Sequence, residues 1–384
     1  MFQSTRLLTP GPTPIPDRVR LAMAQPMMHH RKPEFKNIFA KAQAMCKDLF
    51  GTTQEVLPLT CSGTGAMTAA VHSLFAPDEK VLVVDAGKFG ERWAEIAKVR
   101  GLGIIQLVLP WGKAADPNLI ADQLQENPDI TGVLIQISET STGVMHPIRK
   151  IAEITRRCNV LLVADGISAV GISPVPMDAW GIDCLLTGSQ KGLMLPPGLS
   201  LMAMSERAWQ KVLHVPLSCF YFDLLQERAN VRKNQTHFTS PVSLIVGLHE
   251  ALTMLFEYGL DNIYRKQWAL TQMARAGVCA LGLELFAAEN YAWGLTSLKM
   301  PDQIKSSQVL KLMADSFGII AAAGQDPMKE EILRIGHMGW VDWADLAAGL
   351  YALAQAVPGT YRQSNYLELA VSAYHDALAE GLHY

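Results

Sequence analysis

The sequence has few charged residues and no large excess of either sign. Only 18% of the 384 residues are charged, and the formal net charge is −3. A protein that binds a phosphate backbone needs a basic face, so this balance argues against a nucleic-acid partner. No apolar run approaches the roughly 18 residues of a membrane span. The apolar share of 49% instead predicts a soluble globular protein with a substantial core.

Cysteine is scarce and scattered. The six cysteines stand at positions 46, 61, 158, 184, 219 and 279, and no two of them form a C-x-x-C pair. This spacing fits reduced thiols better than a disulfide framework, a zinc site or an iron–sulfur site, so we expect no metal. The opening segment, MFQSTRLLTPGPTPIP, has too short an apolar stretch for a signal peptide. We therefore expect a cytoplasmic protein.

Short apolar runs alternate with segments of helical length between residues 52 and 204. Near-continuous Val, Ile and Leu strands separated by helices predict a mainly parallel sheet covered on both faces. LSLMAM follows CLLTGS after a short link, so one strand there is expected to be antiparallel. The predicted strands are KVLVVD (80–85), IIQLVL (104–109), GVLIQIS (132–138), NVLLVAD (159–165), CLLTGS (184–189) and LSLMAM (199–204).

The second half of the sequence predicts a smaller domain. PVSLIVGLHEALTMLFEYG (241–259) is typical of one long helix, with Pro near its start and Gly at its end. After it, helical segments alternate with the short strand candidates LTSLKMP, GIIAAAG and ILRIGHMG. We expect an extended N-terminal arm (1–20) packed on the rest, a large domain (21–258) and a small α+β domain (259–384).

Small residues stand where a strand passes into a helix, in TCSGTGAMTAAVHSLF. Ser62, Gly63, Thr64 and Gly65 leave backbone N–H groups at a helix N-terminus free to face an anion. Ordinary connector chemistry is an alternative explanation of the same residues. A dinucleotide fingerprint is another, because Asp85 follows Gly65 by 20 residues. In that fingerprint, however, the third glycine is replaced here by Thr68.

Two charged residues follow neighbouring strands. Asp165 ends NVLLVAD, and Lys191 lies 26 residues later in TGSQKGLMLPPG (187–198). Alone, the first could be a helix cap and the second a solvated loop residue. Together with an anion cradle they suggest pyridoxal phosphate. That cofactor needs an amine for its Schiff base, an acid opposite the pyridine nitrogen and a neutralised phosphate.

Eight motifs extend this pattern along nearly the whole chain, from residue 10 to residue 339. They resemble those of the class V aminotransferases of fold type I, and most closely the alanine–glyoxylate and serine–pyruvate aminotransferase group. The resemblance implies a large domain with a mainly parallel seven-stranded sheet, a smaller α+β domain and pyridoxal phosphate. The motifs are PGPTPIP (10–16), HRKPEF (30–35), SGTGAM (62–67), ETSTGVMHP (139–147), ADGISAVG (164–171), GSQKGLMLPPG (188–198), THFTSP (236–241) and LRIG (333–336).

The resemblance also implies three central roles. Lys191 matches the lysine that binds the cofactor covalently and later moves the proton, and its apolar neighbours are expected to lower its pKa. Asp165 matches the aspartate that keeps the pyridine nitrogen protonated. Arg334 matches the arginine that grips the substrate carboxylate through two parallel hydrogen bonds.

The remaining cofactor contacts are implied in the same way. Thr64, Gly65 and Gln190 match phosphate ligands, with Ser62 and Gly63 in the same loop. Around the ring, Ile167 would lie beneath it, Thr140 would place a hydroxyl near it, and Phe89 stands where some members have a stacked tryptophan. In a homodimer, Thr236 and Thr239 would reach the phosphate of the other subunit. The alternative for Thr239 is a simple helix cap before Pro241.

We expect a ping-pong transaminase that moves the amine of alanine or serine to glyoxylate or pyruvate. A ureidoglycine–glyoxylate aminotransferase shares these motifs and stays open as an alternative. A lyase or desulfurase would need a cysteine on a mobile loop, for which only Cys219 is suitable. Some relatives are labelled soluble hydrogenase subunits, but clustered cysteines for a metal centre are lacking. A non-catalytic protein would be expected to lose Lys191 or Asp165. His29, His30 and His337 are expected to be structural.

Overall fold

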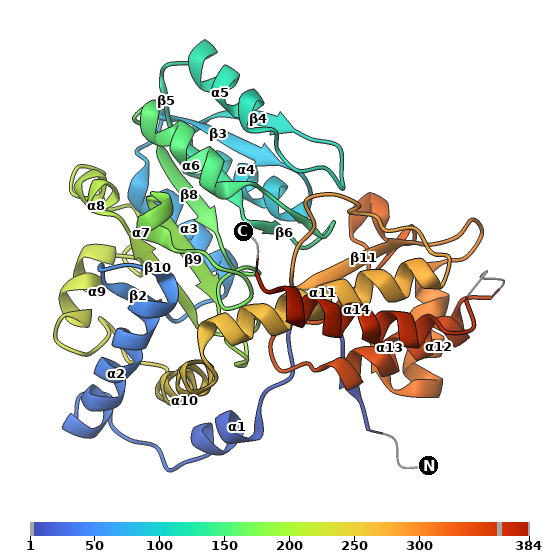
Figure 1. The fold of residues 1–384 in the computed structure, drawn as a ribbon. Coiled ribbons are helices and arrows are strands. Elements are labelled where there is room, and N and C mark those ends of the chain that lie inside the picture. The colour runs from blue at the N-terminus through green and yellow to red at the C-terminus, as the bar shows by residue number, and fades with distance from the viewer. Residues whose placement is uncertain (1–3, 359–362, 383–384) are drawn as a thin grey trace.

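A seven-stranded sheet forms the centre of the large part of the molecule (Figure 1). The computed structural model describes residues 4–358 and 363–382. The strand order is β2-β10-β9-β8-β5-β3-β4. The bounds are β2 Val56–Leu59, β3 Lys80–Asp85, β4 Gly103–Val108, β5 Ile130–Gln136, β8 Leu161–Asp165, β9 Cys184–Gly188 and β10 Ser200–Met204.

The sheet confirms the predicted mainly parallel arrangement. β9, β8, β5, β3 and β4 are parallel neighbours, and β10 runs antiparallel to both β9 and β2. Residues of β2, β8, β9 and β10 are buried throughout, which matches their continuous apolar sequences. β2 is a strand that the sequence analysis did not identify.

Helices cover both faces of this sheet. In Figure 1, α6 (Ile148–Arg157) lies in front of it, whereas α3 (Gly63–Leu74) and α4 (Lys88–Arg100) lie behind it. The predicted long helix is α10 (Val242–Tyr258), and it packs against α1 and α2. The bounds of the other helices here are α1 Asp17–Met23, α2 Pro33–Phe50, α5 Pro117–Glu126, α7 Met177–Trp180, α8 Glu206–Val212 and α9 Leu224–Val231.

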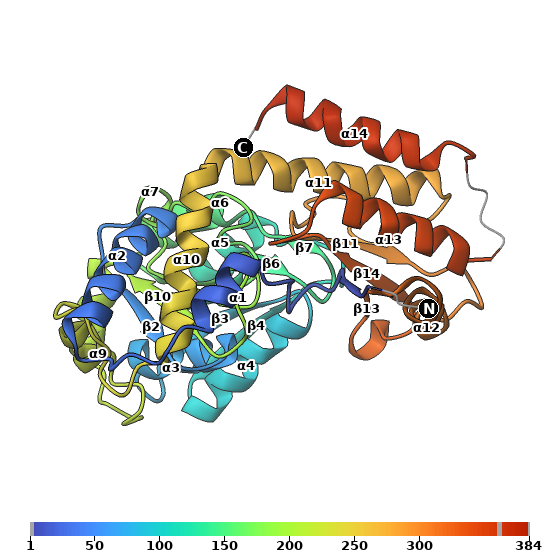
Figure 2. The same cartoon turned by 90° about the horizontal axis from the view of Figure 1, so that it is seen from below.

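A second group of elements follows α10. Its antiparallel sheet has the order β11-β14-β13, and α11 and α14 lie side by side next to it (Figures 1 and 2). Its side chains form a core cluster separate from that of the large sheet. The bounds are α11 Leu260–Ala280, β11 Leu295–Lys299, α12 Ser306–Phe317, β13 Ala322–Ala323, the 3-10 turn Asp326–Met328, β14 Ile332–Gly336, α13 Trp343–Ala356 and α14 Tyr366–Glu380. The domain boundary at 258/259 stays a prediction.

The N-terminal arm joins the two parts. β1 (Arg6–Leu7) pairs in parallel with β12 (Ile319–Ile320), so this part of the arm packs on the second group of elements. The extended conformation expected over 1–20 is wrong beyond Pro16, because α1 begins at Asp17. An acidic residue in the first turn, Asp17, favours that helix start. Residues 1–3 of the predicted arm lie outside the described residues.

Candidate active site

The carboxyl ends of three parallel strands bring the central charged residues together. β8 ends at Asp165, which is in register with Gln136 of β5 and Leu186 of β9. β5 passes directly into the short hairpin of β6 (Ser138–Glu139) and β7 (Val144–Met145). Lys191 follows β9 by three residues. Since parallel strands end at one edge of the sheet, their loops form a common site there.

Asp165 is a buried carboxylate at this edge. Its side chain is 5% exposed, and Oδ1 accepts a hydrogen bond of 2.8 Å from the backbone N–H of Ile167. Burial raises the pKa of Asp165 to about 7, and the nearby carboxylate of Glu139 raises it further, while Lys191 opposes both. Because its pKa lies near neutral pH, the carboxyl group of Asp165 can share a proton with a basic group placed beside it.

Lys191 lies in a buried environment between the sheet edge and the N-terminal arm. The residue is 9% exposed, and its Nζ donates a hydrogen bond to the carbonyl oxygen of Pro10. Burial lowers the pKa of Lys191 to about 8; Arg334 lowers it too, and Asp165 opposes the shift. Roughly a tenth of the amine is therefore unprotonated at pH 7, far more than for an ordinary lysine.

A glycine in the N-terminal arm permits the close contact between the arm and the Lys191 side chain. Gly11 has φ 125°, and a Cβ at that position would lie 2.5 Å from Cε of Lys191. Thr13 adds a second tie, because its Oγ1 donates to the carbonyl oxygen of Lys191 at 3.1 Å. Sequence analysis identified the PGPTPIP segment but missed its contact with the lysine. The glycine between two prolines was the available signal.

The predicted anion cradle is the first turn of α3. Ser62 is the N-cap residue, and the helix begins at Gly63, so Thr64 and Gly65 belong to its first turn. The first N–H groups of a helix lack intrahelical acceptors and carry partial positive charge. Ile167 packs on this turn: its Cδ1 lies 2.2 Å from the position that a Cβ of Gly63 would occupy. The structure therefore brings Ile167 and the cradle together.

Phe89 and Gln190 lie beside this cradle. Arg92 connects Phe89 to Thr64: its Nη1 donates to Thr64 Oγ1 at 3.2 Å, and its Cζ lies 4.8 Å from the centre of the Phe89 ring. Gln190 places Oε1 2.9 Å from the Cβ position of Gly188, at the end of β9. The sequence analysis missed Arg92. Its spacing of three residues from Phe89 on one helix was the signal that could have identified it.

Glu139 was also missed, and it is the most extensively bonded side chain of the site. Its exposed fraction is 0%. Oε2 accepts hydrogen bonds from the N–H of Phe89 and of Gly90, both at 3.1 Å, and from Gln136 Nε2 at 2.8 Å. Oε1 accepts from the N–H of Ser141 at 3.1 Å and from its hydroxyl. Burial raises the pKa of Glu139, and these hydrogen bonds oppose that rise. Glu139 thus fixes the start of α4 against the loop that contains Thr140.

Arg334 reaches this loop from β14. Its side chain, 7% exposed, donates from Nη1 to the carbonyl oxygen of Thr140 at 2.7 Å and from Nε to the carbonyl oxygen of Ala323 at 2.8 Å. Burial lowers the pKa of Arg334 to about 10, whereas Glu139 raises it. The positive charge of Arg334 lowers the pKa of Lys191, which indicates that the two cations lie near each other.

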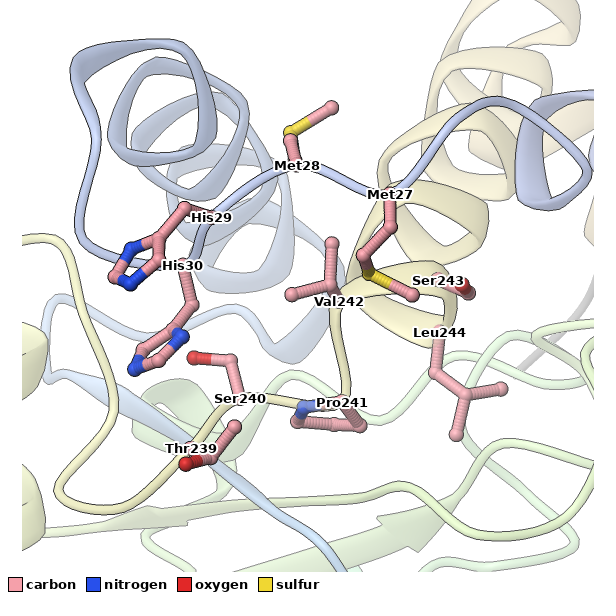
Figure 3. A pocket seen from close by; sticks show the side chains of 10 residues that line it. All are labelled: Met27, Met28, His29, His30, Thr239, Ser240, Pro241, Val242, Ser243 and Leu244. Carbon is pink, nitrogen blue, oxygen red and sulfur yellow. The ribbon is translucent and has the colours of Figure 1, made fainter.

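Thr236 and Thr239 lie elsewhere in the chain. Thr236 Oγ1 donates to the carbonyl oxygen of Phe238 at 2.8 Å, and Thr239 borders an open cavity of about 620 Å³ beside His29 and His30 (Figure 3). Among the described residues, neither threonine hydrogen-bonds to Lys191 or Asp165. The simple cap for Thr239 is wrong, because α10 begins at Val242 without a side-chain cap.

Cys219 and His337 also lie apart from the lysine. Cys219 lines a small cavity of about 100 Å³ with His72 and Leu224. His337 is buried between Gln267 and Thr296, and burial lowers its pKa to about 3. A histidine held neutral in this way fits the structural role that was expected for it.

Known proteins resemble this chain over most of its length. The family model Aminotransferase class-V matches residues 7–339. The soluble hydrogenase 42 kDa subunit of Anabaena cylindrica is 37% identical over 92% of this chain and 93% of its own. The serine–glyoxylate aminotransferase of Methylorubrum extorquens is 32% identical over 87% and 86%. The crystal structure of ureidoglycine–glyoxylate aminotransferase from Bacillus subtilis has a TM-score of 0.92 and 26% identity, covering 98% of this chain and 99% of that one.

Proposed function

Because the chain belongs to the class-V aminotransferase family, we propose that it moves the amine of a small amino acid, serine or alanine, to glyoxylate or pyruvate. The protein is an aminotransferase, and its cofactor is pyridoxal phosphate. The observation that supports the proposal is the grouping of Lys191, Asp165 and Arg334 in one buried site. An amine, an acid and a carboxylate-binding cation are the groups that transamination requires.

The residues present fit this cofactor. Asp165 uses Oδ1 to accept from Ile167, which leaves its other oxygen for a protonated ring nitrogen. Lys191 would attach the cofactor covalently, and the first turn of α3 would bind its phosphate with Thr64, Gly65 and Gln190. Ile167 and Phe89 would border the ring, with Thr140 beside it. When bound, the cofactor supplies an electron sink for the bond that breaks at the substrate Cα.

The chain's own groups would do the remaining work. Lys191 holds and moves the substrate Cα proton, for which a pKa of about 8 suits operation near neutral pH. Asp165 keeps the ring nitrogen protonated, and its burial strengthens this charge interaction. Arg334 is already oriented by two carbonyl oxygens and would grip each carboxylate in turn. One site serving both substrates in succession is the basis of a ping-pong mechanism.

The choice of small substrates is supported by two observations. A 32% identical relative is named serine–glyoxylate aminotransferase. In addition, the arm at Pro10 and Gly11 lies directly on the Lys191 side chain, which favours a compact amino acid over a bulky one. Ureidoglycine is the second candidate donor, favoured by the TM-score of 0.92 to the Bacillus enzyme.

A donor–acceptor panel on the purified holoenzyme tests the proposal. Serine, alanine and ureidoglycine would each be paired with glyoxylate and with pyruvate, and kcat/KM compared. We expect serine or alanine with glyoxylate to give the highest kcat/KM. Double-reciprocal plots of initial rate against donor concentration, at several acceptor concentrations, should be parallel. If kcat/KM with ureidoglycine is at least about tenfold higher, a difference of about 1.4 kcal/mol, ureidoglycine would replace serine and alanine as the proposed donor.

We further propose that the protein forms a homodimer in which each active site contains residues of both subunits. We also propose that it works in a reducing cytoplasm. The open cavity beside Thr239 supports the dimer, because His29, His30 and Thr239 border space that the chain itself leaves unfilled (Figure 3). Thr236 and Thr239 would then contact the phosphate bound by the partner subunit. The six free cysteines support a reducing compartment.

A further inference from the structure

A third cavity lies behind the candidate active site. Its volume is about 690 Å³, within the usual range for small-molecule sites. Its walls come from the end of α10, from α11, from the start of α13 and from α14, which lie next to one another in Figures 1 and 2. We name it the rear cavity.

The rear cavity shares a wall with the active site. Gly192 and Met194, which line it, follow Lys191 directly in sequence. The segment Gly339–Trp343, also in its lining, follows the strand that contains Arg334. The two segments touch: a Cβ at Gly339 would lie 3.2 Å from the carbonyl oxygen of Lys191. A ligand in the rear cavity would therefore contact the segments that position both active-site cations.

The charges of the lining leave a cation available. Of the two acidic residues in the lining, Asp345 pairs with Arg6 at 3.2 Å, and Asp342 caps α13 by accepting from the N–H of Asp345 at 2.9 Å. Lys266 donates only a long hydrogen bond of 3.3 Å, to the carbonyl oxygen of Gly339. Within the described part of the chain, neither Lys266 nor Arg265 forms an ion pair. An ammonium group has three donors, so Lys266 can bind an anion in this cavity.

The cost of burial supports the same conclusion. Burial lowers the pKa of Lys266, and the negative charges of Asp342 and Asp345 oppose that shift without forming an ion pair with it in the described residues. Lys266 is partly buried, and an ammonium that loses part of its water without gaining a paired anion is unfavourable. An anionic ligand would relieve that cost.

Aromatic side chains border the same cavity. Trp340 is 51% exposed, Trp343 is 46% exposed and Tyr258 is 66% exposed, while Tyr374 is half-buried. Aromatic rings bury a large apolar area when a flat partner stacks on them. Exposed apolar residues are usually scattered singly over a protein surface. Several exposed aromatic residues around one cavity are therefore typical of a binding site.

We propose that the rear cavity binds a small aromatic carboxylate, with the carboxylate on Lys266 and the ring against Trp340 and Trp343. A single ammonium beside aromatic faces suits a monoanion with a flat apolar body. The site is distinct from that of Arg334, which does not line this cavity. This binding does not depend on which substrates the active site accepts.

Calorimetric titration of the holoenzyme with phenylacetate tests the proposal. Phenylacetate has no amino or oxo group, so it cannot be transaminated. We expect one saturable site with a Kd of about 1 mM or tighter, and at least about tenfold weaker binding of the neutral analogue phenylacetamide. Absence of saturable binding up to about 10 mM would overturn the proposal.

Variants separate the rear cavity from the active site. Lys266→Met removes the charge but keeps the length of the side chain, and we expect it to weaken phenylacetate binding at least about tenfold. Lys266→Arg should retain binding, which controls for misfolding. Arg334→Lys should also retain it. Binding that survives in Lys266→Met but disappears in Arg334→Lys would assign phenylacetate to the active site and overturn the proposal.

Discussion

Arg334 and Thr140 connect the two parts of the molecule through one hydrogen bond, from Nη1 of the arginine to the carbonyl oxygen of the threonine at 2.7 Å. Thr140 follows Glu139, which in turn binds the N–H groups of Phe89 and Gly90. One series of contacts thus runs from the proposed substrate arginine to the proposed ring platform. Disturbing either end of this series should affect substrate and cofactor to different extents, and the first two predictions use that difference.

Arg334→Lys should raise KM for donor and acceptor alike, by about 10–100-fold, or about 1.4–3 kcal/mol. A lysine cannot form two parallel hydrogen bonds to a carboxylate, and both substrates would use the same grip. The absorption spectrum of the resting holoenzyme should stay nearly unchanged. Arg207→Lys is a matched control, because Arg207 also binds a backbone carbonyl oxygen, that of Val160, away from the site. Loss of cofactor with unchanged KM values would assign Arg334 a structural role.

Glu139→Gln should weaken cofactor binding and alter the visible circular dichroism of the bound cofactor. The amide keeps only one acceptor oxygen, so either the N–H groups at the start of α4 or the donors of Ser141 lose their acceptor, and the link between Phe89 and the Thr140 loop weakens. The free energy of unfolding should fall by roughly 1–3 kcal/mol. Both the cofactor Kd and the dichroism would be measured alongside thermal unfolding.

Asp183→Asn provides the comparison for Glu139. Asp183 is equally a buried carboxylate that accepts from a backbone N–H, that of Leu162 at 3.0 Å, but it lies at the opposite end of β8. We expect similar destabilisation with unchanged cofactor affinity and dichroism. If both variants change stability and neither changes the cofactor signals, Glu139 has no role in positioning Phe89.

Asp165→Asn should retain some cofactor but lower kcat by about 10²–10³-fold, or about 3–4 kcal/mol. A neutral amide does not stabilise a protonated ring nitrogen, and the low-polarity surroundings of Asp165 make that charge interaction strong. Single-turnover kinetics of the first half-reaction measure the effect apart from product release. Near wild-type turnover in a folded Asp165→Asn protein would remove this role from Asp165.

The sequence predicted those features that depend on local pattern. Near-continuous apolar strands identified the sheet, because strands buried on both faces must be apolar along their whole length. β2 was missed because Pro58 weakens the pattern of a strand, and such a residue is tolerated only at a sheet edge, where β2 lies.

The candidate active site, too, could be predicted only where its residues belong to a local pattern. Asp165 and Lys191 could be found because each follows a recognisable strand. Glu139 could not, because its hydrogen-bond partner Phe89 lies 50 residues away, and the contact of Lys191 with Pro10 spans 181 residues. Such contacts depend on how distant segments pack, which hydrophobic periodicity does not specify.

Lys191→Met should stabilise the cofactor-free protein near pH 7, by about 1–3 kcal/mol. The pKa of Lys191 is about 8 in the folded protein, below its ordinary value of 10.5. Between these values the unfolded chain binds more protons, so the wild-type protein gains stability as pH rises from about 8 to 10.5. The variant should lack this gain. Thermal melts of both proteins from pH 7 to pH 10.5 measure it, and parallel pH profiles would contradict a depressed pKa.

A mixed dimer tests whether Thr236 and Thr239 act across the subunit interface. Subunits with Lys191→Ala would be combined with subunits that have Thr236→Val and Thr239→Val, and the heterodimer isolated. If the threonines serve the partner's phosphate, one site collects both lesions and the other is intact. About half of the activity of the wild-type dimer should then return. A heterodimer of Lys191→Ala with wild-type subunits gives the reference value for one intact site. If the threonines serve their own subunit, each site has one lesion, and activity no higher than that of the two parental variants would reject the shared site.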